Sequence, residues 1–250
     1  MILLLDVGNT NTHLGLADDE RIVKQTNIPT AAWSSGRAAN LVSNFTHGKS
    51  IGSAALCSVV PGATPFVHAL CREMGKIKCF ELTHKTVRGI GIDYPKPETI
   101  GPDRLANSLA AKIQFGAPVV VVDFGTAVTF DVVDAKGDYV GGIIAPGLAA
   151  MTDYLHEKTA LLPKIQIREV RGVIGKNTRQ AMLIGAVHGY RGLIRGLLNE
   201  LKRELKCDTF PVIATGGCAK LIASKLPDIT DVQPLLTLEG LRLSLQNQFR

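Results

Sequence analysis

The order of apolar and polar positions along the 250-residue chain alternates between strand and helix periods, and this predicts an α/β protein. Ile2 to Leu5 form a short apolar run of the kind found in strands buried on both faces. Turn-forming residues follow at positions 6–10, and a strand-like pattern resumes from Thr12 to Ala17. Residues 2–17 are therefore predicted to form a β-hairpin.

A second copy of this pattern begins near the middle of the chain. Val119 to Val122 is predicted to be a buried strand, and Val128 to Val133 the strand that returns beside it. An Asp-x-Gly turn thus follows a strand twice, at Asp6 and at Asp123. This degenerate internal repeat predicts two related α/β domains. We expect an N-terminal domain of residues 1–115 and a C-terminal domain of residues 116–250.

The rest of the chain supplies further elements for these two domains. Strands are predicted at residues 54–60, 139–144 and 210–214. Helices are predicted at residues 65–74, 103–115, 147–158, 178–205 and 219–225, with a last helix after Gly240. A loop rich in glycine and proline is expected at residues 88–102, and Pro102 suits the first turn of the helix that follows.

Composition narrows the class of protein. Hydrophobic residues make up 46% of the chain, which is enough for a substantial core, and the net charge is +6 with a pI near 9.1. A basic enzyme is consistent with anionic ligands such as phosphates and carboxylates. The basic residues are scattered and no run resembles a nucleic-acid-binding arm, so we expect no nucleic-acid partner.

The cysteines and the apolar runs indicate where in the cell the protein is expected. The five cysteines are odd in number and no pair has C-x-x-C spacing, which argues against a zinc site and against a disulfide framework. Reduced thiols fit a cytosolic protein. The first apolar run ends at Asp6, too early for a signal peptide, and the run from Ala117 to Val122 is too short to span a bilayer. We therefore expect a soluble, cytoplasmic protein without a membrane partner.

The turn after the first strand has the chemistry of a phosphate site. Gly8 allows a sharp turn and a close approach to a ligand, and Asn9 and Thr10 add side-chain donors to the backbone N–H groups. Asp6 at the strand end could hold Mg²⁺ directly or through water. An ordinary Asx-turn in a hairpin would have the same sequence, so the residues alone leave both interpretations open.

The second turn repeats this chemistry at Asp123, Gly125, Thr126 and Thr129. Two such hairpins that face each other across a cleft would hold phosphates from both sides. A third turn, at residues 215–217, has two glycines before a helix and could admit an adenine or a ribose against the backbone. A plain strand-to-helix turn is the alternative there.

The block from Tyr94 to Arg104 carries a different chemistry. Asp103 and Arg104 fall in the first turn of a predicted helix, where the helix dipole is expected to keep the pKa of Asp103 low. Such an aspartate would orient a substrate hydroxyl and accept its proton late, as in kinases. Arg104 could pair with a carboxylate or with a transferred phosphoryl group. A surface helix cap with an exposed arginine remains the alternative.

Several common sites are excluded by sequence. The P-loop pattern fails because Ser43 stands where it needs a glycine before Gly48-Lys49-Ser50. No G-x-G-x-x-G follows a strand, and neither G-x-S-x-G nor H-E-x-x-H occurs. The six histidines have no metal-ligand spacing.

Taken together, the motifs resemble those of type III pantothenate kinases. Three blocks carry the resemblance: Asp6-Val7-Gly8-Asn9-Thr10, Gly101-x-Asp103-Arg104, and Asp123-x-Gly125-Thr126-Ala127-x-Thr129-x-Asp131. It continues through Gly141-Gly142-x-Ile144-x-Pro146-Gly147, Thr159-Ala160-x-Leu162-Pro163, Gly175-x-Asn177-Thr178, Thr215-Gly216-Gly217 and Leu238-Glu239-Gly240-Leu241. The resemblance covers essentially the whole chain in order.

The resemblance implies an enzyme that phosphorylates pantothenate with ATP, the first step of coenzyme A synthesis. It implies a fold similar to actin and hexokinase, with two ribonuclease-H-like domains and a nucleotide cleft between them. It also implies a homodimer that needs Mg²⁺ and a monovalent cation, K⁺ or NH₄⁺.

Site residues follow from the resemblance, motif by motif. The implied ATP-binding residues are Asp6, Val7, Gly8, Asn9, Thr10, Asn11, Thr12, His13 and Thr126. The implied pantothenate-binding residues are Tyr94, Gly101, Pro102, Asp103, Arg104 and Thr178, with Thr178 reaching from the partner subunit. Asp103 would accept the proton, and Asp123 would hold the monovalent cation. Pro102 departs from the small residue more usual in the family, but proline is tolerated at a helix start, so we expect the geometry to survive.

Two other functions are compatible with parts of the pattern. A non-catalytic relative, similar to accessory transcription factors of the same fold, would not need the intact carboxylates. A kinase of the same superfamily could act on another small alcohol or carboxylate, because only residues 94–104 and Thr178 favour pantothenate.

Overall fold

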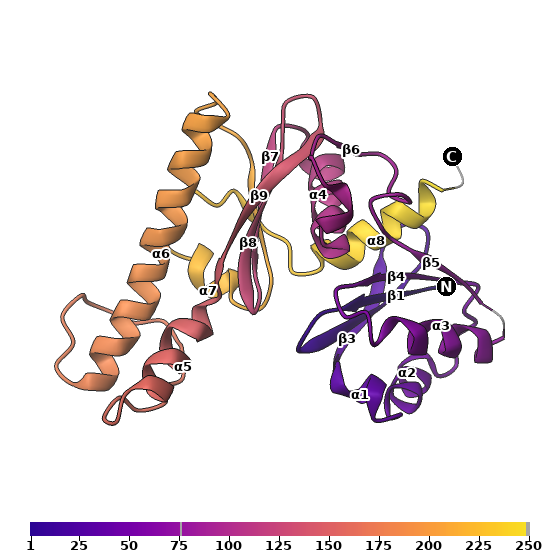
Figure 1. Cartoon of the computed structure of the whole chain (residues 1–250), viewed down its shortest axis with the longest axis horizontal. Helices are drawn as coiled ribbons and strands as arrows, with labels where there is room; N and C mark the ends of the chain where they lie inside the picture. Colours follow the sequence, from indigo (N-terminus) through magenta and orange to yellow (C-terminus); the bar gives the residue numbers. More distant parts are fainter. Residues whose placement is uncertain (76, 249–250) are drawn as a thin grey trace. The chain divides into compact units, whose positions relative to one another are not determined.

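A computed structural model describes residues 1–75 and 77–248 and divides the chain into two compact units, each built around a β-sheet (Figure 1). Unit 1 comprises Met1–Gly116, Gly137–Val140 and Leu235–Arg250. Unit 2 comprises Ala117–Lys136 and Gly141–Pro234.

The sheet of unit 1 has five strands in the order β3-β2-β1-β4-β5. Its strands are β1 (Ile2–Val7), β2 (Asn11–Ala17), β3 (Ile22–Pro29), β4 (Ser53–Ser58) and β5 (Lys78–Glu81). The first three strands are antiparallel, whereas β4 and β5 run parallel to β1. The helices of this unit are α1 (Ala31–Ser34), α2 (Ala38–Thr46), α3 (Thr64–Glu73), α4 (Pro102–Phe115) and α8 (Leu236–Gln246). The short elements β6 (Gly91–Ile92) and a 3₁₀ turn (Pro97–Thr99) lie in the predicted loop before α4.

Alternation along β1 decides which residues face which helices. One face packs into a core with α1, α2 and α3, and it carries Leu3, Leu5 and Val7 (Figure 1). Leu4 points to the other face, where both Leu4 and Leu238 of α8 lie beside Gly15. Asp6 has the parity of Leu4, so its side chain is on the face that α4 and α8 cover.

The sheet that unit 2 contributes to has the order β11-β10-β7-β8-β9-β6. Its strands are β7 (Val119–Phe124), β8 (Ala127–Val133), β9 (Asp138–Pro146), β10 (Val212–Thr215) and β11 (Asp231–Val232). The first residues of β9 belong to unit 1, where they pair with β6. The helices of unit 2 are α5 (Leu148–Lys158), α6 (Thr178–Glu204) and α7 (Ala219–Ala223).

The internal repeat predicted from sequence is present in the topology. The order β9-β8-β7-β10-β11 has the same antiparallel and parallel pairings around its central strand as β3-β2-β1-β4-β5. Asp6 and Asp123 each stand one residue before the end of that central strand. Their neighbours on the parallel strand are Cys57 and Thr215.

Most elements lie where the sequence pattern predicts them, and the α/β class is confirmed. The allocation of the C-terminal residues is different from the prediction. The last helix begins at Leu236 rather than after Gly240, and residues 235–250 belong to unit 1 instead of a C-terminal domain of residues 116–250. The physical reason is that α8 packs on α4 and on the second face of the unit 1 sheet, which would otherwise expose apolar side chains to water.

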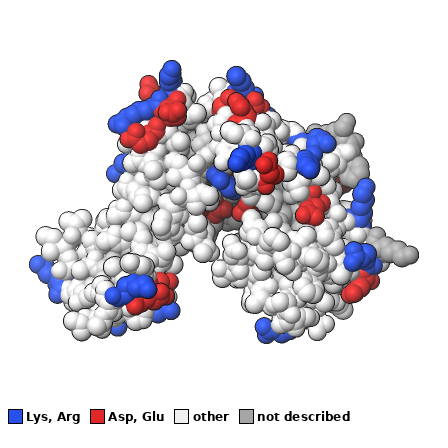
Figure 2. All heavy atoms as spheres, in the orientation of Figure 1, with Lys and Arg blue, Asp and Glu red and all other residues white. Residues whose placement is uncertain are grey.

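Three further observations concern membrane-spanning helices, thiols and surface charge. No helix within the described ranges is long and apolar enough to cross a bilayer. All five cysteines are free thiols. Acidic and basic side chains lie intermixed on the face of the molecule shown in Figure 2.

Candidate active site

A cluster of two carboxylates and a thiol lies at the carboxyl end of β1 in unit 1. The Sγ atom of Cys57 donates a hydrogen bond to Oδ1 of Asp6 at 3.3 Å. Burial, and after it the charge of Asp103, raise the pKa of Asp6 to about 7, although the bond from Cys57 acts in the opposite direction. Burial and the same two carboxylates raise the pKa of Cys57 well above its ordinary value. Cys57 was not predicted as a site residue, because nothing in its local sequence marks it.

Asp103 is held at the start of α4. Its Oδ1 accepts a hydrogen bond from the backbone N–H of Arg104 at 2.9 Å. Gly101 is the residue before the helix, and a Cβ there would overlap the Asp103 carboxylate, so a larger residue would force that side chain to shift. Pro102 opens the helix as expected.

The predicted low pKa of Asp103 is wrong in direction. Burial raises the pKa of Asp103, and this outweighs both the bond from the Arg104 N–H and the positive charge of Arg104. The sequence argument counted the helix dipole but could not count the loss of water around the carboxylate. Asp103 is therefore a better proton acceptor than an ordinary surface aspartate.

An aromatic pair lies beside Arg104. The rings of Tyr94 and Tyr139 meet edge to face, with centroids 6.1 Å apart and planes at 65°. The guanidinium of Arg104 lies 5.8 Å from the centroid of Tyr139. Tyr139 is buried and pairs with Ile92 of β6, so it lies beside both Tyr94 and Arg104 although it is far from them in sequence. The sequence pattern predicted Tyr139 only as the first residue of a strand, and nothing local marked it as a site residue.

The first hairpin loop is fixed by its own hydrogen bonds. The N–H of Gly8 donates to the carbonyl of Asn11 at 3.0 Å, and Thr30 Oγ1 donates to the carbonyl of Gly8 at 2.7 Å. The N–H of Thr30 also donates to the carbonyl of Thr10 at 3.0 Å. Asn9, Thr10 and Asn11 remain exposed at the surface.

Other predicted residues of this hairpin are interior. Val7 and Thr12 are fully buried. The Thr12 hydroxyl lies 3.1 Å from that of Thr30 and accepts a hydrogen bond from Trp33 Nε1 at 3.0 Å. The side chains of Val7 and Thr12 are interior and stabilise the hairpin. Any contact of these two residues with a ligand therefore has to come from the backbone. His13 is partly buried.

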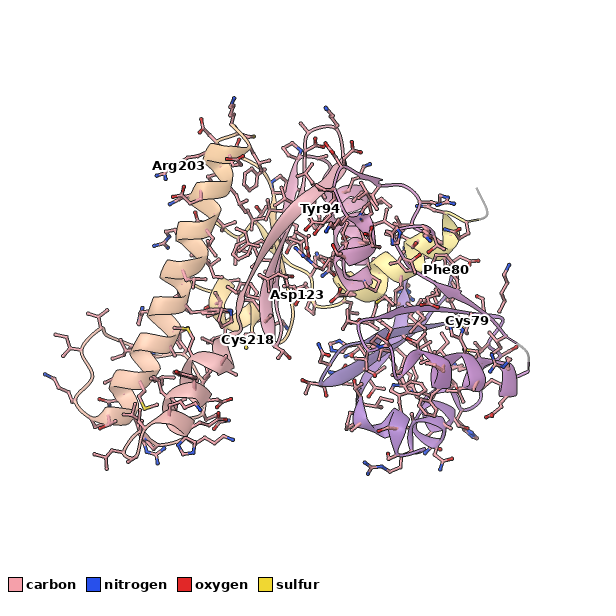
Figure 3. The ribbon with its side chains drawn as sticks, viewed as in Figure 1. Cys79, Phe80, Tyr94, Asp123, Arg203 and Cys218 are labelled. Atoms are coloured by element: carbon pink, nitrogen blue, oxygen red, sulfur yellow. The ribbon has the colours of Figure 1, made fainter. Side chains whose placement is uncertain are left out.

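In unit 2, Asp123 lies against a turn that only glycine can form (Figure 3). Gly216 has φ +90°, and a Cβ there would overlap the Asp123 carboxylate and lie 2.7 Å from the backbone of Phe124. The N–H of Cys218 donates to the carbonyl of Phe124 at 3.4 Å. By contrast, a Cβ on Gly217 would meet nothing within 4 Å. The first glycine of the pair is therefore structural, and the second faces open space.

The loop that carries Thr126 packs closely against Gly147. The N–H of Gly147 donates to the carbonyl of Thr126 at 3.1 Å, and a Cβ on Gly147 would overlap the carbonyls of Gly125 and Thr126. Gly125 and Thr126 are themselves exposed. The packing thus presents the second hairpin loop at the surface of unit 2.

The motif around Thr178 is the start of α6. The side chain of Asn177 accepts a hydrogen bond from Gln180 N at 2.9 Å, and Gln180 Oε1 accepts one from Lys176 N at 3.0 Å. Gly175 packs so closely on Ala181 that a Cβ would lie 2.5 Å from its nitrogen. These neighbours build the helix end and leave Thr178 exposed.

The predicted residues fall into two groups. Unit 1 brings Asp6, Asp103, Arg104 and Tyr94 into one neighbourhood, through Cys57 and Tyr139. Unit 1 also holds the other predicted residues of the first hairpin and of the start of α4, whereas unit 2 holds Asp123, Thr126 and Thr178. The approach of Asp6 and Asp123 across a cleft stays a prediction.

Comparison with known proteins adds the following. Residues 2–200 match a family described as type III pantothenate kinase. A type III pantothenate kinase of Methylacidiphilum infernorum is 42% identical over 243 residues, which are 97% of this chain and 87% of that protein.

Similar solved structures share the fold at low identity. A putative Baf family transcriptional activator from Campylobacter jejuni has a TM-score of 0.62 at 19% identity and covers 98% of both chains. MreB 5 of Spiroplasma citri bound to AMPPNP has a TM-score of 0.57 at 12% identity, and the match covers 99% of this chain and 97% of that one. At these identities the likeness shows the fold alone, and it confirms the expected actin-like class.

Proposed function

The chain belongs to the type III pantothenate kinase family, and from that premise we propose which of its residues perform the reaction. The activity is the ATP-dependent phosphorylation of pantothenate to 4'-phosphopantothenate, which begins coenzyme A biosynthesis. Phosphoryl transfer leaves little covalent work to the protein, because the reacting groups need mainly to be positioned and their charge compensated. The residues can therefore be assigned by what each one positions.

Asp103 orients the primary alcohol of pantothenate and accepts its proton. Its position at the start of α4 and its raised pKa support this role, since both favour proton transfer near neutral pH. The electrostatic interaction between Asp103 and Asp6 is the observation that carries the proposal. It supports a proton acceptor close to the end of the strand from which the first phosphate loop begins.

Arg104 binds the pantothenate carboxylate, and Tyr94 adds a contact from the same side. A guanidinium matches a carboxylate with two parallel hydrogen bonds. The Tyr139 ring beside Arg104 and Tyr94 supports a common orientation of these two residues. Gly101 and Pro102 contribute by shaping the helix start, and Thr178 reaches pantothenate from the partner subunit.

The two hairpin loops bind the phosphates of ATP. The exposed groups are those of Asn9, Thr10 and Asn11 in the first loop and Thr126 in the second. The backbone at Asp6, Val7, Gly8, Thr12 and His13 completes the first loop. Gly217, whose Cα has open space around it, lies on the adenine side.

Asp6 and Asp123 suit cations in different ways. Asp6 and Asp103 repel each other, and a Mg²⁺ ion held by Asp6 together with the phosphates would remove that repulsion. Asp123 lies so close to Gly216 that a Cβ there would overlap its carboxylate, and this carboxylate is our candidate oxygen ligand for a monovalent cation, K⁺ or NH₄⁺. Within the described residues no group of three or more His, Cys, Asp or Glu side chains could hold a metal, so phosphate oxygens are needed as further ligands.

A homodimer is supported by the exposed face of α6. Four glycines on that helix share one face, and a Cβ on any of them would meet nothing within 4 Å: Gly185, Gly189, Gly192 and Gly196. Glycine inside a helix costs about 1 kcal/mol relative to alanine, and a closely packed second helix would offset that cost. The apolar residues Leu161, Val173 and Ile174 of the same unit are more than 70% exposed.

The free thiols support a cytoplasmic location.

One assay tests the assignment of the substrate. Purified protein is incubated with ATP, Mg²⁺ and a panel of small alcohols and hydroxy acids, with and without K⁺, and ADP release is measured. We expect ADP release with pantothenate, at a rate that falls several-fold when K⁺ is replaced by Na⁺. ADP release with another acceptor but not with pantothenate would identify a different kinase of the superfamily. No release with any acceptor would favour a non-catalytic relative.

A further inference from the structure

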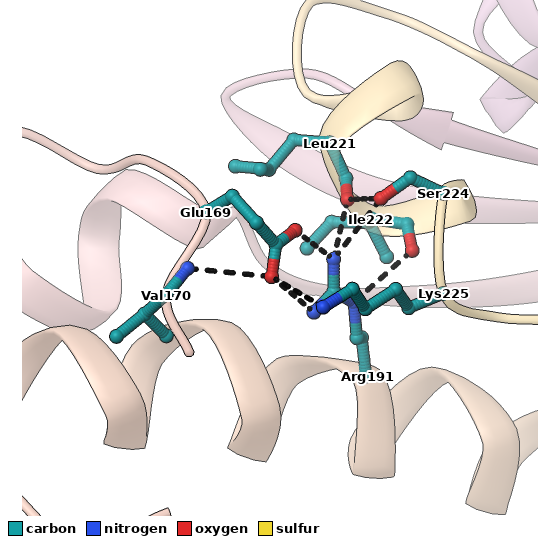
Figure 4. Close-up of polar contacts among 7 residues, drawn as sticks. All are labelled: Glu169, Val170, Arg191, Leu221, Ile222, Ser224 and Lys225. Atoms are coloured by element: carbon teal, nitrogen blue, oxygen red, sulfur yellow. Dashed lines mark hydrogen bonds and ion pairs between the residues drawn. The ribbon is translucent and has the colours of Figure 1, made fainter. Parts of the chain in front are cut away.

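A buried arginine in the middle of α6 has no part in the site described above. Arg191 is 5% exposed, although arginine is almost never fully buried without compensation. Its guanidinium is satisfied by several acceptors from two different parts of unit 2 (Figure 4). The buried charge of Arg191 is thus compensated by hydrogen bonds and by an ion pair.

The first set of acceptors closes the short helix α7. Arg191 Nε donates to the carbonyl of Ile222 at 3.2 Å, and Nη2 donates to the carbonyl of Leu221 at 2.6 Å and to Ser224 Oγ at 3.3 Å. These carbonyls stand in the last turn, where carbonyls lose their regular helical donors, although that of Ile222 also accepts the N–H of Lys225 at 3.5 Å. Since α7 follows the turn at Gly216 and Gly217, Arg191 fixes the helix behind the adenine-side turn.

The second partner is a carboxylate from a segment without regular structure. Residues 159–177 connect α5 to α6 without a helix or strand. Glu169 in this segment meets Arg191 in a bidentate pair, at 3.2 Å from Nη1 to Oε1 and 2.7 Å from Nη2 to Oε2. Lys225 Nζ lies 3.6 Å from Glu169 Oε1. Arg191 is the main cause of the low pKa of Glu169, about 2, so the pair stays ionised throughout the physiological range.

Other hydrogen bonds hold the two ends of the segment: His156 Nδ1 lies 2.9 Å from the carbonyl oxygen of Leu162, and the N–H of Lys176 donates to Gln180 Oε1 at 3.0 Å. The N–H of Val170 donates to Glu169 Oε1 at 3.3 Å, and Arg179 Nη1 donates to the carbonyl of Lys164 at 3.2 Å. Its C-terminal end passes directly into the start of α6 at Thr178. Releasing Glu169 would therefore free the middle of the segment that leads into Thr178, while Lys176 and Asn177 stay bonded to Gln180.

We propose that Arg191 is a positioning residue for the kinase reaction, which holds α7 behind the adenine-side turn and, through Glu169, holds the segment that delivers Thr178 to pantothenate. The inference rests on the proposed roles of Gly217 and Thr178. Arg191 thereby affects the binding of ATP through α7 and of pantothenate through Glu169, and it contacts neither substrate.

The two halves of this arrangement can be separated by mutation. Glu169→Gln removes the ion pair but leaves the Arg191 bonds to α7 in place. Arg191→Lys cannot form the bidentate pair or reach all the carbonyls, so it weakens both halves. Glu200→Gln is the matched control, because Glu200 pairs with Arg203 on the same helix at 2.6 Å with both side chains more than 60% exposed.

The test measures kcat and the separate KM values for pantothenate and ATP in the full-length enzyme, with hydrogen exchange of residues 159–177 as a readout independent of activity. For Glu169→Gln we expect faster exchange in that segment, a rise of about 5- to 10-fold in KM for pantothenate and a KM for ATP within about 2-fold of wild type. For Arg191→Lys we expect both KM values to rise. Glu200→Gln should change neither.

Two results would overturn the proposal. Glu169→Gln with faster exchange but unchanged KM for pantothenate would show that the segment does not position Thr178. An equal loss of kcat in every variant without a change in KM would show a purely structural role. If Arg191→Lys does not fold, the partly exposed Glu169 still provides the decisive variant. Failure of the wild type to release ADP with pantothenate would be a separate result, which concerns the substrate assignment alone.

Discussion

Asp6 at the end of β1 and Asp103 at the start of α4 form an electrostatically coupled pair: the charge of Asp103 adds to burial in raising the pKa of Asp6 to about 7. Two carboxylates that approach each other in a partly buried place destabilise the fold unless a proton or a cation joins them. The two charged carboxylates that could bind a cation therefore lower the stability of the ligand-free protein.

This loss of stability gives a pH dependence with a definite sign. Asp6 has a pKa of 3.8 when unfolded and about 7 when folded, so the folded state binds more protons between these values. Stability of the ligand-free protein should fall as pH rises from about 4 to 7, by up to ~4 kcal/mol from this group. Asp6→Asn should remove that dependence and be more stable than wild type at pH 8. Chemical unfolding at pH 5.5 and pH 8 measures it, with the exposed Asp208→Asn as control; parallel pH profiles for wild type and Asp6→Asn would contradict the coupling.

Replacing the proton acceptor should separate catalysis from binding. Asp103→Asn keeps the hydrogen-bonding shape at the helix start but cannot take a proton. We expect kcat to fall by about 10²-fold or more, with ATP affinity by calorimetry within about 3-fold and folding intact. Glu98→Gln, a change on the exposed 3₁₀ turn nearby, should keep wild-type kinetics. Near wild-type turnover in Asp103→Asn would refute the role of Asp103.

The two neighbouring glycines of the third turn should respond differently to alanine. Gly216→Ala places a methyl group into the Asp123 carboxylate at φ +90°, so we expect a loss of stability of about 1–3 kcal/mol and a higher K⁺ concentration for half-maximal activity. A methyl group at Gly217 has open space around it, so the free energy of unfolding of Gly217→Ala should lie within about 0.5 kcal/mol of that of the wild type. Titration of activity with KCl and chemical unfolding measure both. Equal K⁺ dependence in the two variants would argue against a cation at Asp123.

Close packing of α8 on α4 predicts the cost of one methyl group. A Cβ at residue 240 would overlap the backbone of Ala106, so Gly240→Ala must push the two helices apart. We expect a loss of about 2–3 kcal/mol in the free energy of unfolding. Gly52→Ala, at an exposed glycine with nothing within 4 Å, should change stability by less than about 0.5 kcal/mol. Similar urea midpoints for the two variants would contradict the close contact.

The glycine face of α6 can be tested by size. Gly189→Leu adds a bulky side chain where this chain offers no neighbour, so the fold should tolerate it while a dimer should not. We expect analytical ultracentrifugation to show a monomer for Gly189→Leu and a dimer for wild type. Gln114→Leu, an exposed change on α4, serves as control for added hydrophobicity. A dimeric Gly189→Leu variant would move the interface elsewhere.

Sequence patterns were sufficient for the elements that depend on local signals. Strand β1, strand β7 and their hairpins follow from apolar runs that stop at Asp6 and Asp123, because a buried strand ends where turn-forming residues begin. Pro102 marked the start of α4 for a similarly local reason, since its fixed φ suits a first helical turn.

What could not be predicted depends on contacts between distant residues. Cys57 and Tyr139 belong to the site only because strand pairing brings them beside Asp6 and Tyr94. The pKa of Asp103 was predicted in the wrong direction because its sign depends on burial, which a sequence does not show. For the same reason the pattern located the last helix approximately but not the unit to which α8 belongs.

Unit 1 is assembled from both ends of the chain, with α8 covering a face of the sheet that begins at residue 2. On the ribosome, the strands of that sheet emerge long before their cover does, and nearly all of unit 2 is translated in between. The neighbourhood of Asp6 and Asp103 therefore cannot reach its final packing in a nascent chain that still lacks residues 235–248. A truncated translation product that stops short of α8 would expose apolar sheet surface and become a substrate for chaperones or proteases.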